Sequence, residues 1–575
     1  MKLLDMPGEL LLLVGENLSI KDIYHFLSTC GKLSSLLTPL LGKRGVQDVG
    51  EQSALHWAVN HGHASLAKLA LLSIERERLN GANSLRRSPL HLAAMHRNPA
   101  IIRLLAARGE STDARDELSC TPLHSAAFFQ YTANCRILLE YTVEVDAKDK
   151  YAQTPLHLAS RGKSADIINL LVAHGAAIGA RDEKSRTPLH IAARRGGPDT
   201  ICTLVAHGAL VNDRDEDSTT PLHLAASRCC PKAVPLLVTL GAMINARDKR
   251  SQTPLHMAAK CNFPGNIRVL VAHGATIDAR DESSRTPLHL AAMKSDPDGL
   301  SSLIALGATI DARDKGLQTP LHLAAWFNYT DTIRVLVAHS ASIDARDESS
   351  RTPLHLAATN KDPVGIQILI AHGAMIDARD NGLQTPLHLA AGSNYSDIIQ
   401  ALVAHGATID ARDECSRTPL HLAAYWNYSH AIRALVAHGA TIDARDERSR
   451  TPLHLAASNN DPVGILILIA HGATIDARDK SLQTPLHVAA WWNYPEAIRA
   501  LVAHGATIDA RDAGSRTPLH LAAMHNDPVA MPLLIAHGAT IDARDKDSQT
   551  PLHLAAWYKY QDSVRALVAH GANYV

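Results

Sequence analysis

The chain has 575 residues, of which 57 are Lys or Arg and 57 are Asp or Glu, so its formal net charge is zero. This balance excludes a general attraction of the whole chain to nucleic acid or to an anionic membrane. The eight cysteines form no Cys-x-x-Cys pair and follow no regular spacing, which indicates reduced thiols in an intracellular protein.

Residues 1–47 precede the repeated part of the chain and are predicted to form two or three short helices. A proline suited to a first helical turn is followed by apolar residues at helical spacing: Pro7, Leu10, Leu13, Leu18 and Ile23. The apolar run at 10–14 lacks the flanks of a signal peptide and is too short to span a bilayer. Helices this short bury little surface alone, so the segment needs the repeats or another protein to cover it.

This N-terminal segment resembles an F-box. The resemblance rests on Met6-Pro7, Glu9-Leu10 and Asp22-Ile23 and on the leucines between them, although Met6 stands where that family usually has Leu. It implies a small helical bundle that docks onto a Skp1-type adaptor of a cullin ubiquitin ligase. The adaptor contacts that it implies are Pro7, Leu10, Leu13, Leu18 and Ile23. The segment could instead cap the end of the repeats, which terminal repeats need for solubility, and both roles are compatible.

Residues 48–575 repeat with a period of 33, marked by the tetrapeptide Thr-Pro-Leu-His. The histidines of this grid are His56, His91, His124, His157, His190, His223, His256, His289, His322, His355, His388, His421, His454, His487, His520 and His553. A fixed period of this length indicates one supersecondary unit stacked about sixteen times. Such an array favours an extended binding surface over an enclosed enzyme pocket.

One unit near the C-terminus illustrates the repeat. Thr484 is suited to capping a helix, and Pro485 fits its first position, where no N–H is needed. Asn493 is expected at the break between two helices, because Asn tolerates the left-handed conformation of a tight turn. A second helix is predicted over 496–504, and Gly505 is expected to end it.

This unit resembles the ankyrin repeat. The shared residues are Thr484-Pro485-Leu486-His487, Ala500-Leu501-Val502-Ala503-His504-Gly505-Ala506 and Ile508-Asp509-Ala510. The resemblance covers residues 48–575 and implies an all-α repeat solenoid, with two antiparallel helices and a projecting β-hairpin finger in each repeat. The turn between the helices departs from the family, because it has Asn-Tyr or Asp-Pro where Gly-His is common.

The repeats show no pattern of a catalytic or metal site. The repeated histidine is expected to hydrogen-bond nearby backbone or the capping Thr, and no Cys or carboxylate stands beside it at ligand spacing. The Arg of the repeated Ala-Arg-Asp is expected to form a solvated pair with the Asp that follows it. His-Glu-x-x-His, Gly-x-Ser-x-Gly and P-loop patterns are absent. We therefore expect no enzymatic activity, metal or cofactor.

Aromatic pairs stand at the predicted end of the first helix in several repeats. They are Trp326 with Phe327, Tyr425 with Trp426, Trp491 with Trp492, and Trp557 with Tyr558. The ankyrin resemblance implies that this end, together with the finger, faces a concave groove that varies with the ligand. Because Trp and Tyr are favoured anchors at protein interfaces, the pairs are predicted to bind a protein partner in that groove. The alternative is that the rings only pack on neighbouring first helices.

These observations predict a non-catalytic protein that binds other proteins. The leading hypothesis is a substrate-recruiting F-box subunit of a cullin-type ubiquitin ligase, with the groove holding the substrate and residues 1–47 holding a Skp1-type adaptor. The alternative is an ankyrin scaffold or transcriptional coregulator with no role in ubiquitin transfer. Neither hypothesis includes nucleic acid or a membrane as a partner, and both place the protein in the cytoplasm or nucleus. The oligomeric state is left open.

Overall fold

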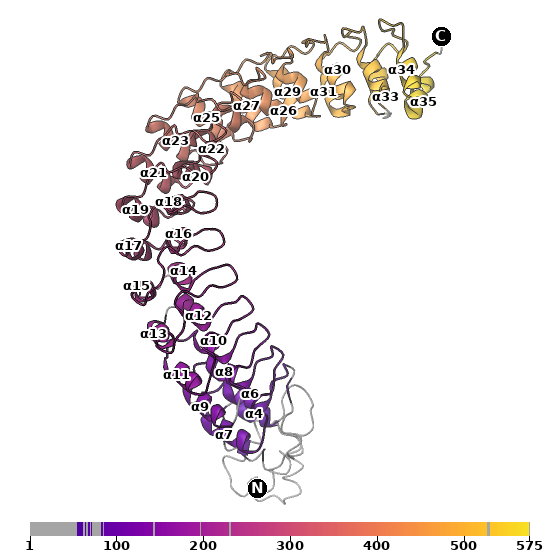
Figure 1. Ribbon diagram of the computed structural model, residues 1–575. Helices are drawn as coiled ribbons and strands as arrows, with labels where there is room; N and C mark the ends of the chain where they lie inside the picture. Colours follow the sequence, from indigo (N-terminus) through magenta and orange to yellow (C-terminus); the bar gives the residue numbers. More distant parts are fainter. Residues whose placement is uncertain are drawn as a thin grey trace, which may run out of the picture. The chain divides into compact units, whose positions relative to one another are not determined.

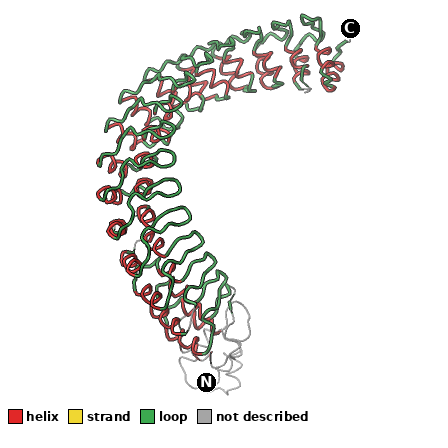
Figure 2. Tube along the Cα trace, in the orientation of Figure 1, coloured by secondary structure: helices red, strands yellow, loops and turns green. Residues whose placement is uncertain are grey.

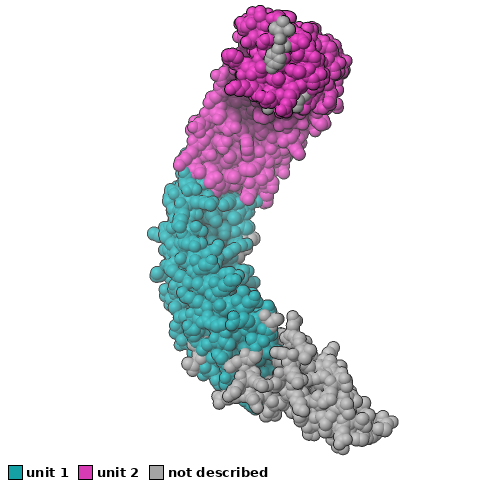
Figure 3. All heavy atoms as spheres, turned by 90° about the vertical axis from the view of Figure 1, so that its right-hand side faces the viewer, with its two compact units in different colours: residues 1–282 teal, residues 283–575 magenta. Residues whose placement is uncertain are grey.

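The computed structural model describes residues 54–573 except 61, 63, 65–66, 69–70, 72–81, 84, 142–143, 196, 229–231 and 526–528. The chain divides into two compact units, unit 1 over 1–282 and unit 2 over 283–575, coloured teal and magenta in Figure 3. Each unit is a stack of helix pairs, which confirms the expected all-helical repeat solenoid. The F-box-like segment 1–47, with its predicted adaptor contacts, lies outside the described residues.

Unit 1 alternates a first and a second helix in each repeat. Its first helices are α4 (Ala54–Asn60), α6 (Pro89–Ala94), α8 (Pro122–Phe128), α10 (Pro155–Ala159), α12 (Pro188–Arg195), α14 (Pro221–Ala226) and α16 (Pro254–Lys260). Its second helices are α7 (Pro99–Ala107), α9 (Thr132–Glu140), α11 (Asp166–Ala173), α13 (Pro198–Ala206), α15 (Ala233–Thr239) and α17 (Pro264–Ala272).

Unit 2 continues the same alternation. Its first helices are α18 (Pro287–Ala292), α20 (Pro320–Trp326), α22 (Pro353–Ala357), α24 (Pro386–Ala391), α26 (Pro419–Tyr425), α28 (Pro452–Ala457), α30 (Pro485–Trp491), α32 (Pro518–Ala523) and α34 (Pro551–Trp557). Its second helices are α19 (Asp298–Ala305), α21 (Thr330–Ala338), α23 (Val364–Ala371), α25 (Ser396–Ala404), α27 (Ser429–Ala437), α29 (Pro462–Ala470), α31 (Pro495–Ala503), α33 (Ala530–Ala536) and α35 (Gln561–Ala569).

The helices of unit 1 form two layers. First helices such as α12, α14 and α16 lie beside one another, and second helices such as α13, α15 and α17 form the other layer (Figure 1). A long loop projects from each repeat on the side of the first helices (Figure 2). These loops occupy the place of the expected β-hairpin fingers, but no strand is assigned within the described residues.

Small and branched apolar residues fill the space between the two layers. In the repeat that begins with α28, the fully buried apolar side chains are Leu453, Ala456, Ala457, Ile465 and Leu468. The alanines on the first helix allow the second helix to approach closely, while Ile and Leu on the second helix supply most of the buried apolar area. Each fully buried Leu or Ile contributes roughly 1.5–3 kcal/mol to the stability of the repeat.

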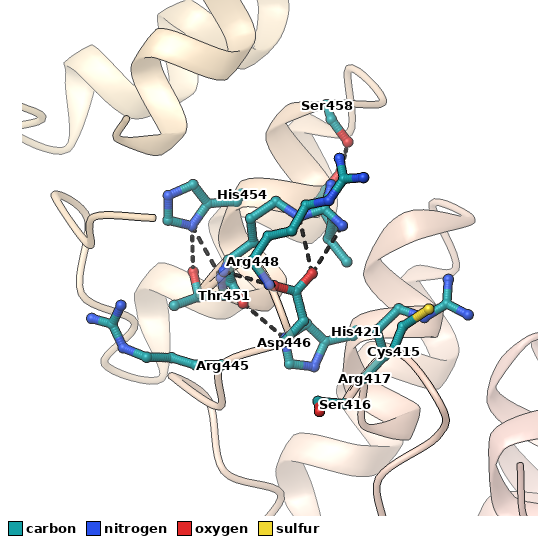
Figure 4. Close-up of polar contacts among 12 residues, drawn as sticks. Cys415, Ser416, Arg417, His421, Arg445, Asp446, Arg448, Thr451, His454 and Ser458 are labelled. Atoms are coloured by element: carbon teal, nitrogen blue, oxygen red, sulfur yellow. Dashed lines mark hydrogen bonds and ion pairs between the residues drawn. The ribbon is translucent and has the colours of Figure 1, made fainter. Parts of the chain in front are cut away.

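The first helices from α6 to α34 begin with the same local arrangement, drawn for α28 in Figure 4. Thr451 is extended, at φ −95° and ψ 164°, and Pro452 takes the first helical position. The backbone N–H of Thr451 donates to Nδ1 of His454, at 3.1 Å, and the Thr hydroxyl lies 2.9 Å from the same nitrogen. The histidine thus replaces the Glu of an ordinary capping box, and the expected bond between His and the capping Thr is confirmed.

The second ring nitrogen of the repeat histidine links one repeat to the next, as His421 of the preceding repeat shows. Nε2 of His421 lies 3.0 Å from the carbonyl oxygen of Arg450, which is 29 residues further on. Because a backbone N–H of Thr418 can only donate to Nδ1, and a carbonyl can only accept, the ring is neutral with its proton on Nε2. Burial lowers the pKa of His421 to about 4, which keeps the ring in this state.

The finger turns around a buried carboxylate. Oδ1 of Asp446 accepts the backbone N–H groups of Arg448 and Arg450, each at 2.8–2.9 Å, and its Oδ2 binds the Arg450 side chain at 2.9 Å (Figure 4). Ser449 takes the left-handed conformation at φ 59° to close the turn. In three repeats a leucine holds this strained position instead, at Leu317, Leu383 and Leu482.

In most repeats the arginine of Ala-Arg-Asp donates to backbone carbonyls and is not paired with the Asp beside it. Nη1 of Arg445 donates to the carbonyl of Ser449 at 3.2 Å and to the carbonyl of Arg478, in the next repeat, at 2.7 Å. The expectation of a solvated pair with the adjacent Asp is therefore wrong. The reason is that Asp446 turns into its own finger, where it satisfies the backbone N–H groups.

Two further bonds join consecutive repeats. The backbone N–H of Glu447 donates to the carbonyl of Cys415 in the preceding finger, at 3.0 Å. The backbone N–H of Thr441 donates to Asp410 of the preceding repeat, also at 3.0 Å. Since equivalent bonds recur along each unit, the junction between repeats is defined almost entirely by residues of the repeated motif.

Replacing His421 with Leu should destabilise the array by about 2–4 kcal/mol, because it leaves the Thr418 N–H buried without a partner and removes the bond to the next repeat at the Arg450 carbonyl, which then keeps only the N–H of Asp446. Urea unfolding of the full chain measures this loss. The matched control is His438→Leu, at an exposed histidine just after a second helix, which should change stability by less than about 0.5 kcal/mol. Equal effects of the two variants would contradict a structural role for the bridging histidine.

The array should lose stability as the pH falls from about 6.5 toward 4. The pKa of buried repeat histidines such as His124 and His421 is lowered to about 4, chiefly by burial, whereas an unfolded histidine has a pKa near 6.5. Between these values the unfolded chain binds protons that the folded chain does not, so each such histidine costs up to about 3 kcal/mol at pH 4. Thermal unfolding measured from pH 7.5 to 4.5 tests this, and a midpoint independent of pH would contradict it.

Candidate protein-binding surface

All eight predicted anchor residues lie at the end of a first helix. Trp326, Tyr425, Trp491 and Trp557 are the last residues of α20, α26, α30 and α34. Phe327, Trp426, Trp492 and Tyr558 are the residues that cap the carboxyl ends of those helices. The structure therefore places each aromatic pair where the sequence predicts it.

The aromatic side chains are exposed although the alanines before them are buried. Their exposed fractions are 47% for Trp326, 40% for Phe327, 42% for Tyr425, 54% for Trp426, 37% for Trp491, 54% for Trp492, 76% for Trp557 and 44% for Tyr558. In the same helices Ala423 and Ala424, directly before Tyr425, are completely buried. The alternative that these rings only pack on neighbouring first helices does not account for such exposure.

Ring contacts occur within a repeat or with the next one. Tyr425 and Trp426 meet edge to face with ring centroids 5.1 Å apart, and Phe327 stacks on Tyr329 at 5.6 Å. Trp491 meets His525 of the following repeat edge to face at 4.9 Å. These contacts orient the rings without covering them, so the pairs keep a free apolar surface.

The turn that follows Trp491 and Trp492 is held by a hydrogen bond to the next repeat. Asn493 takes a left-handed conformation at φ 56°, which confirms its expected place between the two helices. Its Oδ1 also accepts the backbone N–H of Ala530, at the start of a second helix in the next repeat, at 3.2 Å. The aromatic residues of α30 therefore stand on a backbone that is fixed by hydrogen bonds to a neighbouring repeat.

Unit 1 contains an aromatic pair that the sequence reasoning missed. Phe128 and Phe129 occupy the same position at the end of α8, are 46% and 39% exposed, and meet edge to face at 5.2 Å. Together with Tyr151 and Leu118 of two adjacent fingers they line a cavity of about 270 Å³. Phe128 follows His124 by the same number of residues as Trp326 follows His322, so the repeat period alone could have identified this pair. The shared lining shows that first-helix ends and fingers contribute to one surface.

The described residues contain no arrangement typical of a metal centre. Within the described ranges, no group of three His, Cys, Asp or Glu side chains could hold a metal ion. The repeat histidines are occupied by the bonds between repeats, and histidines after second helices bond backbone, as His504 does to the carbonyl of Ala500 at 2.8 Å. In the part of the chain that the structure describes, no helix has both the length and the apolar character needed to cross a bilayer.

Comparison with protein families returns a match to the model described as ankyrin repeats in three copies. The matched ranges are 25–116, 55–149, 90–182, 156–248, 222–314, 288–380, 321–413, 367–446, 420–512 and 508–575. Together they cover residues 25–575 and overlap the second half of the F-box-like segment. No F-box model matches residues 1–47. Comparison with curated proteins returned no match.

Proposed function

We propose that this chain, which belongs to the ankyrin repeat family, is a non-catalytic protein that binds a protein partner through the first-helix ends of unit 2. Ankyrin repeats mediate protein binding, and that general role applies to this chain. The observation that supports the specific surface is the exposure of four aromatic pairs at equivalent positions of one unit. We place this activity in the cytoplasm or nucleus.

The energetic argument follows from the area of the exposed rings. A buried aromatic side chain covers about 150–250 Å², so a half-exposed ring retains about 100 Å² that a partner can cover. At about 25 cal/mol per Å², each ring would contribute roughly 2.5 kcal/mol to binding before the cost of association is subtracted. Trp and Tyr also lose little conformational entropy when bound, which suits them as anchors on a rigid backbone.

Replacing Trp491 and Trp492 together with Ala should weaken partner binding at least about tenfold, while the thermal unfolding midpoint stays within a few degrees. The measurement compares proteins retained from a cell extract by the full chain and by the variant, with affinities measured for those that the full chain retains. The reason is that these rings are exposed, so their loss removes contact area for a partner and little packing within the fold.

The matched control replaces Val463 and Leu466 with Ala. Both are apolar and about equally exposed, at 45% and 41%, but they lie on the second helix α29. The control should leave binding unchanged. Equal weakening by both variants, or loss of stability in parallel with loss of binding in the tryptophan variant, would overturn the proposed surface and support a packing role.

We further propose that residues 1–47 recruit a Skp1-type adaptor, which would make the chain a substrate-recruiting subunit of a cullin ubiquitin ligase. The support is the sequence resemblance at Pro7, Leu10, Leu13, Leu18 and Ile23. An ankyrin scaffold or coregulator that has no adaptor is the alternative. The two differ in one measurable property, which is binding to the adaptor itself.

A purified Skp1-type protein should bind the full chain, and Pro7→Ala combined with Leu10→Ala should abolish that binding, because both residues belong to the implied contact face. Co-purification of the two proteins measures this. The tryptophan variant of unit 2 serves as the control and should bind the adaptor normally. If the intact chain does not bind, the scaffold function replaces the ligase function.

A further inference from the structure

The position that carries aromatic pairs in unit 2 carries cations in the middle of unit 1. At intervals of 33 residues, the position of Phe128 is taken by Arg161 and then Arg194. The position of Phe129 is taken in the same way by Gly162, Arg195 and Arg228. The next repeat has Lys260 at the end of α16. We define the cationic row as Arg161, Arg194, Arg195, Arg228 and Lys260. It spans four consecutive repeats of one unit at the first-helix ends.

Within the residues that the structure describes, no carboxylate pairs with a cation of this row. Arg161, Arg194 and Arg195 line a cavity of about 110 Å³ together with Gln153 and Arg186. Arg186 is neutralised by the buried Asp182, at 2.7 Å. Among the described residues, by contrast, no acidic group lies within ion-pair distance of the cationic row.

The arginines of the cationic row repel one another electrostatically. The pKa of Arg161 is lowered by partial burial and by the charges of Arg195, Arg194 and Arg186. The pKa of Arg194 is lowered in the same way, with Arg228 the first of its charged neighbours. A cluster of like charges that no internal carboxylate relieves is a surface complementary to an anion.

An apolar cavity lies directly beside the cationic row. The cavity of about 270 Å³ under Phe128 and Phe129 shares two lining residues with the arginine cavity, namely Gln153 and Arg161. The guanidinium of Arg161 lies 5.2 Å from the centre of the Phe128 ring, in cation–π contact. One ligand could therefore place an apolar group in the first cavity and negative charge in the second.

We propose that the cationic row and the Phe128 cavity form one site for an acidic peptide segment of a partner protein, anchored by an apolar side chain. A peptide fits better than a nucleic acid, because Asp149 lines the apolar cavity and disfavours a phosphate at that point, whereas Asp116 is paired with Arg87 at 3.5 Å. A peptide carries carboxylates only along the row and an uncharged group at the cavity. This site lies in unit 1 and does not depend on the aromatic pairs of unit 2.

The spacing of the ligand follows from the spacing of the repeats. Packed helices are about 8–10 Å apart, and an extended peptide advances about 3.3 Å per residue. Arg161 lines the cavity itself, and Arg194 stands one repeat further along the row, so about three residues separate the apolar anchor from the acidic residue that meets Arg194. The remaining acidic residues follow along the row.

The experiment uses the full chain and the fluorescein-labelled peptide Trp-Gly-Ser-Glu-Glu-Ser-Glu-Glu, with binding measured by fluorescence anisotropy. We expect binding that weakens with added salt, and weakens at least about tenfold when Gln replaces each Glu of the peptide or Ser replaces its Trp. Arg194→Gln with Arg195→Gln should weaken binding by a similar factor. A labelled oligouridine should bind less tightly than the peptide.

The matched control is Arg136→Gln with Arg268→Gln, which removes the same charge from exposed second-helix positions of unit 1. It should bind the peptide normally, as should the Trp491 and Trp492 variant of unit 2. Unfolding curves of all variants show whether the fold is intact, and Arg161→Gln provides a second test if Arg194→Gln with Arg195→Gln unfolds. Absence of peptide binding, equal loss in the control, or tighter binding of oligouridine would each overturn the proposal.

Discussion

The stacking of the repeats from α6 to α32 depends on a buried imidazole in the first helix of each repeat. Its Nδ1 accepts the N–H that opens its own first helix, and its Nε2 reaches a finger carbonyl of the next repeat, as in His421 with Thr418 and Arg450. One side chain therefore joins local structure to the interface between repeats. Both bonds require the neutral ring with its proton on Nε2. Burial keeps the ring neutral, and the stacking of the repeats is what buries it.

Several hydrogen bonds hold each repeat to the next, and the residues that make them show which other positions of the repeat can vary in sequence. The histidine bridge, the Arg445 contact to the next finger and the Asp446 turn all come from the repeated motif. The first-helix end contributes to none of these bonds, because its backbone leaves the buried layer at that point. Its side chains can therefore be aromatic or cationic, as Trp491 and Arg194 show, without altering the fold. A change of side chain at this position therefore leaves the bonds between repeats in place.

Sequence predicted what is encoded within one repeat and missed what forms between repeats. The helix start at Pro485, the left-handed Asn493 and the left-handed Gly505 each follow from the conformational limits of a single residue, and the structure has all three. The Nε2 atom of His421 bonds a carbonyl 29 residues away, and the guanidinium of Arg445 bonds a carbonyl 33 residues away. Only the packing of one repeat on the next defines those distances.

The candidate surface was also only partly predictable from the sequence. In particular, the zero net charge of the chain does not describe the charge at the first-helix ends. Composition averages over the chain, whereas the proposed ligands would contact one position of each repeat. When the residues at that position are aligned, Phe128 is followed by Arg161 and Arg194, while the compensating acids lie in the fingers and pair there, as Asp182 does. A balanced composition excludes a field around the whole chain but permits an unpaired cationic row on one face. In an array of nearly identical repeats, differences at equivalent positions are what a ligand could distinguish, which is why the proposed sites lie there.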